Sequence, residues 1–140
     1  MWWGGGGGQF KWSHYQSPEA ITAILDTTAR QLLDFGAQVL VLMAGHYPWQ
    51  SFLDQVVPAL REDYPDDLIL AGTEVSICGD AVMLKGDHAA REKTSLGLAL
   101  FAQMGEDARE ASNEHGEQVL ATVIDHLAQT IKAFTDRESH

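Results

Sequence analysis

The 140-residue sequence has little cysteine, few cationic side chains and no long apolar run. Its one cysteine, Cys78, cannot form an internal disulfide, which favours a reducing compartment. Nine Lys and Arg residues against 20 Asp and Glu residues give a net charge of -11, which repels nucleic-acid phosphates and anionic lipids. No window holds the roughly 18 apolar residues of a membrane span.

The beginning of the sequence also lacks the pattern of a secretory signal peptide. Trp2 and Trp3 lead into the run of glycines from Gly4 to Gly8, with no basic region followed by an apolar one. We therefore expect a cytoplasmic protein that binds neither nucleic acid nor membranes.

The composition is that of an ordinary folded protein, with 45% hydrophobic and 21% charged residues. The length suits one domain. We expect a single α/β domain over residues 1–140, in which the glycine- and aromatic-rich residues 1–17 form a loop-like lead segment.

A helix is predicted over residues 18–35. Ser17 can cap its N-terminus, and Pro18 suits the first helical position. Gly36 stands where the helix needs a left-handed stop. Helical spacing predicts one largely apolar, core-facing side made of Ile21, Ile24, Leu25, Thr28, Leu32 and Phe35.

Two apolar segments, 38–44 and 66–72, have the length of strands and no polar alternation, which is typical of parallel strands covered on both faces. The helix predicted between them at 49–63, which Pro58 is expected to kink or shorten, makes a right-handed crossover. The remaining predicted elements are a long surface loop at 73–87 with a short strand at 81–85, and helices at 90–104 and 113–134.

His46 directly follows the first predicted strand. In open α/β sheets, ligands bind beyond the carboxyl ends of the strands. We expect Gly45 to let the backbone turn tightly there, so that the imidazole of His46 projects at the rim as a metal ligand or proton carrier. The alternative is a structural or solvated histidine.

Asp87 and His88 form a second candidate group at the start of the helix predicted near 90. A carboxylate beside an imidazole can raise its basicity or bind a metal. The alternative is a helix-capping Asp with an exposed His. Thr94 and Ser95 are expected to face the preceding turn or the core.

Aromatic residues gather near the N-terminus and beside His46. We expect three of them to form walls of a ligand pocket, namely Trp12, Tyr47 and Trp49. Such rings can stack on a small planar ligand. The alternative is that they fill a core or a subunit interface. His115 and His126 are expected on the solvated edge of the last helix.

The segments AGHYPWQSF (44–52) and GDHAAREKTSLGLAL (86–100) together resemble the creatininase, or creatinine amidohydrolase, family. The first is similar to the family's N-G-H-Y-E-N turn, and the second to its E-H-A-G-x-x-E-T-S segment. The resemblance covers most of residues 12–130, including an A-S-N-E-H-G-E start to the final helix.

This resemblance implies a three-layer α/β/α sandwich with a mainly parallel sheet, and a metal-dependent amidohydrolase acting on a small, cyclic amide. It implies that His46 binds a divalent metal, zinc or manganese, that Tyr47 lines the pocket, and that His88 with its acidic neighbour Asp87 moves a proton. A homo-oligomer is also expected.

Three departures bear on that activity. Pro48 stands where the family has a metal-binding Glu, and Lys93 stands where it has the Glu of E-T-S. The family's first metal-binding segment would lie before Met1. The alternatives are therefore a chain that has lost the metal and serves as a non-catalytic oligomeric or binding module, or a subunit completed by a partner chain.

Overall fold

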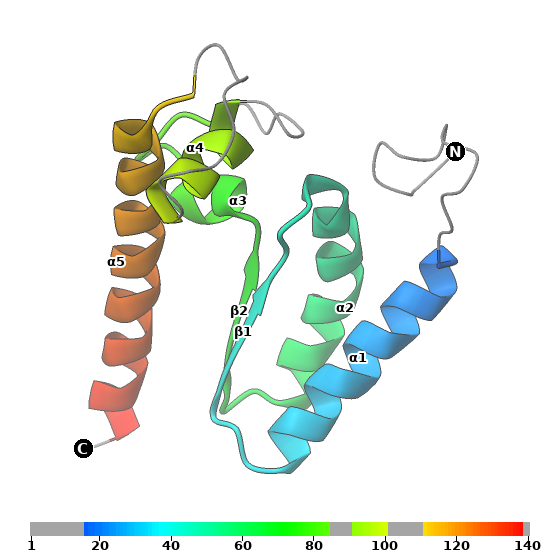
Figure 1. The fold of residues 1–140 in the computed structure, drawn as a ribbon. Helices are drawn as coiled ribbons and strands as arrows, with labels where there is room; N and C mark the ends of the chain where they lie inside the picture. Colours follow the sequence, from blue (N-terminus) through cyan, green and yellow to red (C-terminus); the bar gives the residue numbers. More distant parts are fainter. Residues whose placement is uncertain (1–15, 85–90, 101–110, 139–140) are drawn as a thin grey trace. The chain divides into compact units, whose positions relative to one another are not determined.

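The computed structural model describes residues 16–84, 91–100 and 111–138 (Figure 1). The elements in chain order are α1 (Pro18–Asp34), β1 (Val39–Met43), the 3-10 helix η1 (Tyr47–Trp49), α2 (Gln50–Asp63), β2 (Leu68–Gly72), α3 (Glu74–Cys78), α4 (Arg91–Leu100) and α5 (Asn113–Glu138). Contacts divide the chain into two compact units, residues 1–73 and 74–140. The expectation of a single domain stays a prediction.

The ends of α1 are set by the residues that the sequence indicated. The Ser17 hydroxyl accepts a hydrogen bond from the Ala20 N–H at 3.2 Å, which satisfies a free donor of the first turn. Gly36 has a φ of 93° and donates its N–H to the Leu33 carbonyl at 2.8 Å. This backbone conformation favours glycine, so the predicted stop is confirmed.

The buried side of α1 differs from the predicted one. Ala29 and Leu33 are buried, with Leu25 packed against them, whereas Ile24, Leu32 and Phe35 are exposed. The helix contacts α2 and β1 through the side that carries Ala29 and Leu33. The helical spacing correctly identified an apolar side of α1. The side that packs against α2 and β1, however, is the one that carries the small residue Ala29.

β1 and β2 are parallel neighbours, with Val39 opposite Leu68 and Met43 opposite Gly72. The predicted strand pair and its helical connection are therefore confirmed. Figure 1 shows α1 and α2 side by side along the strands. The core between these helices and the sheet consists of Ala29, Leu33, Leu40, Ala44, Leu53, Val56, Val57, Leu60 and Ile69.

Pro58 neither ends nor shortens α2, which continues to Asp63. Pro58 is exposed, whereas Val56, Val57 and Leu60 on the other side of the helix are buried. Burial of that apolar side outweighs the hydrogen bond that proline cannot donate.

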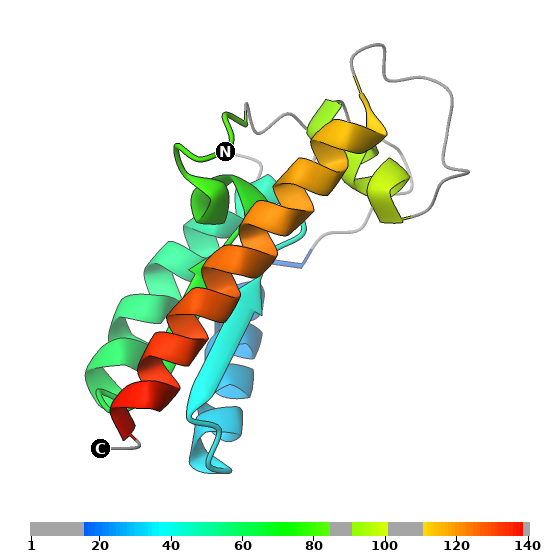
Figure 2. The same ribbon diagram turned by 90° about the vertical axis from the view of Figure 1, so that its left-hand side faces the viewer.

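The second unit contains α3, α4 and α5, and Figure 2 shows α5 as one long helix with α4 beside its N-terminal turns. The predicted loop is wrong at residues 74–78, where α3 forms and buries Cys78. No strand forms at 81–84, and Lys85 lies outside the described residues. Buried Cys78, Val82 and Val119 form the core of this unit.

α4 and α5 approach closely at Gly116. A Cβ atom at this position would lie 1.9 Å from the backbone oxygen of Ser95. Ser95 is fully buried, as expected for a core-facing residue, and its hydroxyl accepts a hydrogen bond from the Ser112 N–H at 3.1 Å. Glycine at 116 is therefore what allows these two helices to lie so near.

Candidate functional site

The candidate site lies where β1 and β2 end. The parallel register places Met43 beside Gly72, and the Ala44 N–H extends the pairing by donating to the Gly72 carbonyl at 2.9 Å. Both carboxyl ends therefore lie at one edge of the sheet. His46 follows the end of β1, and Thr73 follows the end of β2.

His46 precedes η1 with extended backbone angles of φ -136° and ψ 121°. Its carbonyl accepts a hydrogen bond from the Trp49 N–H at 2.9 Å, which fixes the turn after it. The Nε2 atom of its imidazole is buried. The hydrogen bond to its carbonyl and the burial of Nε2 therefore fix the position of His46 at the edge of the sheet.

Gly45 does not have the role that the sequence suggested. Its φ is not positive, and a Cβ atom there would meet nothing within 4 Å. The chain bends at this point without any need for glycine, so the expectation of a glycine-dependent tight turn is wrong.

The two aromatic residues of η1 are placed differently. The hydroxyl oxygen of Tyr47 is buried, while 41% of Trp49 is exposed. The Trp49 ring packs edge to face against Phe52, with 6.2 Å between centroids and an angle of 81° between planes. Trp49 therefore offers accessible indole surface on a supported ring, which suits stacking on a planar group.

Gln50 connects the two sides of this edge, and it is not among the residues predicted from the sequence. Its Oε1 atom accepts a hydrogen bond from the Thr73 N–H at 3.2 Å, and its Nε2 donates to the Asp54 carboxylate at 2.9 Å. The amide thus ties the start of α2 to the residue that follows β2. A glutamine in the first helical turn gives no sequence signal for such a bond.

Three of the predicted site residues, Trp12, Asp87 and His88, lie outside the described residues. The structure brings His46, Tyr47 and Trp49 together on one short segment. The pairing of Asp87 with His88, and the place of both relative to His46, stay predictions.

Metal ligands are sparse in the part of the chain that the structure describes. No group of three or more His, Cys, Asp or Glu side chains gathers there. Pro48 offers only its carbonyl, which accepts a hydrogen bond from the Ser51 hydroxyl at 2.8 Å. Because protein zinc sites use three or four protein ligands, these residues do not fit a complete metal site, although His46 can supply one ligand.

Among the described residues of the second unit, Glu74 and Cys78 are buried titratable groups, and the sequence indicated the burial of neither. Glu74, at the start of α3, is 6% exposed. Burial raises the pKa of the Cys78 thiol, and the Glu74 carboxylate raises it further. Because the thiolate is the nucleophile, a thiol that stays protonated suits a structural cysteine.

The two histidines of α5 are in different environments. His115 is not on the solvated edge, because its Nε2 atom is buried, and no hydrogen-bond partner for that atom lies among the described residues. His126 is exposed, as expected.

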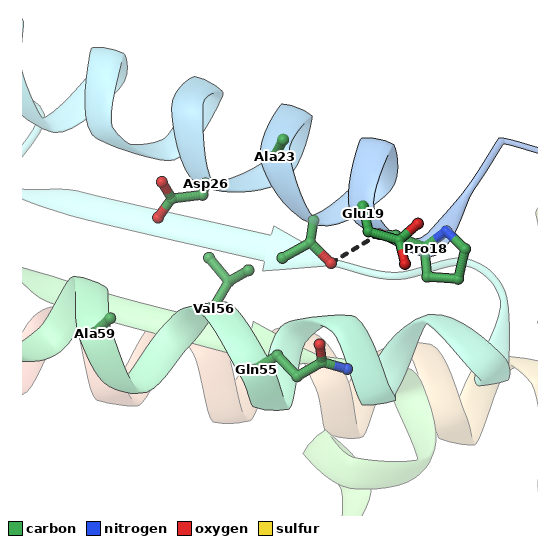
Figure 3. A pocket seen from close by; sticks show the side chains of 8 residues that line it. Pro18, Glu19, Ala23, Asp26, Gln55, Val56 and Ala59 are labelled. Atoms are coloured by element: carbon green, nitrogen blue, oxygen red, sulfur yellow. Dashed lines mark hydrogen bonds between the residues drawn. The ribbon is translucent and has the colours of Figure 1, made fainter.

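A groove of about 490 Å³ lies between α1 and α2 (Figure 3). Its charged residues already have structural partners: Asp26 binds Arg30 at 3.0 Å, and a backbone hydrogen bond, together with Ser17, lowers the pKa of Glu19. Thr22 donates its hydroxyl to the Pro18 carbonyl at 2.9 Å. His46, Tyr47 and Trp49, the predicted site residues that the structure describes, do not line this groove, so it is not the candidate site.

No protein-family model matches the sequence, and no curated protein sequence matches it. Among solved structures, a mutant creatininase of the Zn-Zn type is similar, with a TM-score of 0.68 and 22% identity over 92% of this chain and 69% of that chain. Likeness at this identity concerns the fold, so the chain has a creatininase-like α/β fold, as the resemblance implied. No helix in the described ranges is long and apolar enough to cross a membrane.

Proposed function

We propose that this chain is a creatininase-like protein that acts on a small amide at the carboxyl ends of β1 and β2, where it contributes to hydrolysis of a C–N bond. The observation that carries the proposal is the position of His46 in a creatininase-like fold, just beyond a parallel strand and with a buried Nε2 atom. Ligand sites of open α/β sheets lie at this edge. A neutral imidazole there suits a metal ligand.

The proposed cofactor is a divalent metal, zinc or manganese, which when bound would polarise the amide and activate water. His46 is the residue of this site that would hold it. Because the described residues contain no cluster of three ligands, the other ligands in this proposal come from outside the described ranges or from a partner chain.

The substrate in this proposal is a planar amide that stacks on the exposed ring of Trp49, since that ring is held by Phe52. Tyr47 lines the same edge, and Trp12 is proposed as a further wall. His88, with Asp87 beside it, is the proposed acid and base. These roles rest on the family resemblance.

The proposal includes the three-layer sandwich and a cytoplasmic location. Val41 and Met43 on β1 are 36% and 46% exposed, and both belong to the side of the sheet opposite buried Leu40. A helical layer over that apolar side would complete the sandwich.

The experiment that tests the metal site is the metal content of purified, tag-free protein, measured by elemental mass spectrometry. We expect about one zinc or manganese per chain, lost in His46→Ala and kept in the matched variant His126→Ala, whose side chain is exposed on α5. Hydrolysis of a panel of cyclic amides should be measurable in the proteins that keep the metal and absent from the variant that loses it. Protein without metal and without hydrolysis after zinc or manganese is added would contradict the proposal.

A second function is favoured by Pro48, which has no side-chain donor at the position of the family's Glu. The chain would then be a non-catalytic module that binds a planar amide through Trp49. In that case, amide binding measured by calorimetry would be weakened in Trp49→Ala and unchanged in His46→Ala. Metal-dependent hydrolysis lost in His46→Ala would exclude this second function.

A further inference from the structure

The turn that carries His46 is held together by hydrogen bonds within itself. The Trp49 N–H donates to the His46 carbonyl at 2.9 Å, and the Gln50 N–H donates to the Tyr47 carbonyl. These bonds join residues three apart, so residues 46–50 form one compact turn. The position of this turn at the edge of the sheet therefore depends on the contacts that attach it to the neighbouring strands.

The side chain of Gln50 attaches the turn to the end of β2. Its Oε1 atom accepts a hydrogen bond from the Thr73 N–H at 3.2 Å. The Gly72 carbonyl, in the same peptide unit, accepts a hydrogen bond from the Ala44 N–H of the neighbouring strand. Because the N–H and the carbonyl of a trans peptide point in opposite directions, the Thr73 N–H faces away from β1. The peptide that follows β2 is thus bonded on one side to β1 and on the other to Gln50.

Asp54 determines the direction in which the Gln50 amide points. The Nε2 atom of Gln50 donates to the Asp54 carboxylate at 2.9 Å, one helical turn further along α2. A carboxylate can only accept a hydrogen bond, so the nitrogen of the amide faces Asp54 and its oxygen is left for the Thr73 N–H. Both polar atoms of the amide are therefore used, and each has one suitable partner.

We propose that Gln50 is a positioning residue of the candidate site, whose amide sets the place of His46 relative to the end of β2. This role rests on the proposed function, in which His46 holds a divalent metal. Residues that orient a metal-binding histidine from outside the ligand set change the metal affinity by about 10–100-fold. Because Gln50 acts through the backbone of the turn, we expect the lower end of that range.

The first test is the rate at which diethylpyrocarbonate modifies His46 in the native full chain, measured by mass spectrometry of peptides. The buried Nε2 atom should make this rate low in the wild type. Gln50→Ala should increase it about fivefold to tenfold, since the loss of one hydrogen bond shifts a local opening equilibrium by about that factor. The dissociation constant for zinc should increase about tenfold in the same variant.

The matched control is Gln55→Ala, which removes a glutamine from the same helix. The Gln55 amide donates to the Ser51 carbonyl at 2.9 Å, within α2 rather than to β2. This variant should leave both the modification rate of His46 and the dissociation constant for zinc unchanged.

An exchange of the two bonded side chains separates positioning from a contribution to overall stability. Gln50→Glu alone brings two carboxylates together and should increase the modification rate of His46. Addition of Asp54→Asn supplies an amide donor to the new carboxylate, whose other oxygen accepts the Thr73 N–H, and it restores the net charge. The double variant should therefore return the modification rate to nearly the wild-type value. A glutamine that only stabilised the fold would lower the urea midpoint and leave this rate unchanged.

A modification rate of His46 that Gln50→Ala leaves unchanged would overturn the inference. So would an equal increase in Gln55→Ala, or a double variant that reacts as fast as Gln50→Ala. A wild-type chain that binds no metal would contradict the proposed function instead, and the modification rate would still show whether Gln50 positions His46.

Discussion

Replacing Gly116 with alanine should separate α4 from α5. The added Cβ would lie 1.9 Å from the Ser95 backbone oxygen, 2.5 Å from its carbonyl carbon and 3.0 Å from the Ala99 Cβ. The first two contacts are with backbone, which cannot move aside by changing a rotamer. One helix must therefore shift until the first distance increases from 1.9 Å to about the 3.4 Å of ordinary contact.

Two opposing contributions decide whether Gly116→Ala raises or lowers the free energy of unfolding. Alanine favours a helix interior over glycine by about 1 kcal/mol. Overpacking of a tight contact costs about 1–3 kcal/mol and more where backbone must move, and the shift also loosens the packing around Val119, which is fully buried. We expect a net loss of about 2 kcal/mol in the free energy of unfolding, or a lowering of Tm by roughly 5 °C.

Urea unfolding followed by circular dichroism measures the loss, and hydrogen exchange should show faster opening of α4. The matched control is Gly45→Ala, since a Cβ at Gly45 meets nothing within 4 Å and its φ is not positive. That variant should change the free energy of unfolding by no more than about 0.5 kcal/mol. A Gly116→Ala variant as stable as the wild type would show that α4 and α5 tolerate a side chain at this contact, contrary to the prediction.

Two further predictions concern single residues. Gly36→Ala should destabilise the protein by about 1 kcal/mol in urea unfolding, because a side chain disfavours the φ of 93° although the surrounding space is open; an unchanged midpoint would contradict this. The Cys78 thiol should react slowly with a thiol reagent at pH 8, since its pKa is raised in the folded chain. Because the folded chain holds this proton more tightly, the proton contributes to the free energy of unfolding; that contribution is fully present below the ordinary thiol pKa and decreases as the pH rises above it. A rapid reaction of Cys78 in the native protein would contradict the prediction.

Local signals in the sequence predicted the elements around the candidate site well. Ser17 and Gly36 gave the ends of α1 because capping and a left-handed stop depend on residues within one turn. The apolar segments that became β1 and β2 were identified because continuous apolar residues of strand length are typical of parallel strands. Burial on both faces is not confirmed for β1, since Val41 and Met43 are 36% and 46% exposed. The position of His46 beyond β1 followed directly from these boundaries.

Other features depend on contacts between residues far apart in sequence. Nothing near Gln50 indicates that its amide binds Thr73, 23 residues later. The burial of Cys78 in α3 likewise depends on Val119, 41 residues away. Short helices of this kind are selected by tertiary packing rather than by propensity.

The sequence by itself determined the ends of α1, the parallel strand pair with its helical connection, and the presence of an apolar side on α1. The tertiary structure decided that α1 packs through Ala29 and Leu33 and leaves Ile24 and Phe35 exposed. It also decided that α4 and α5 meet at Gly116. The physical reason is that capping and periodicity act within a few residues, whereas the choice of the buried side depends on the shape of the surface against which a helix packs.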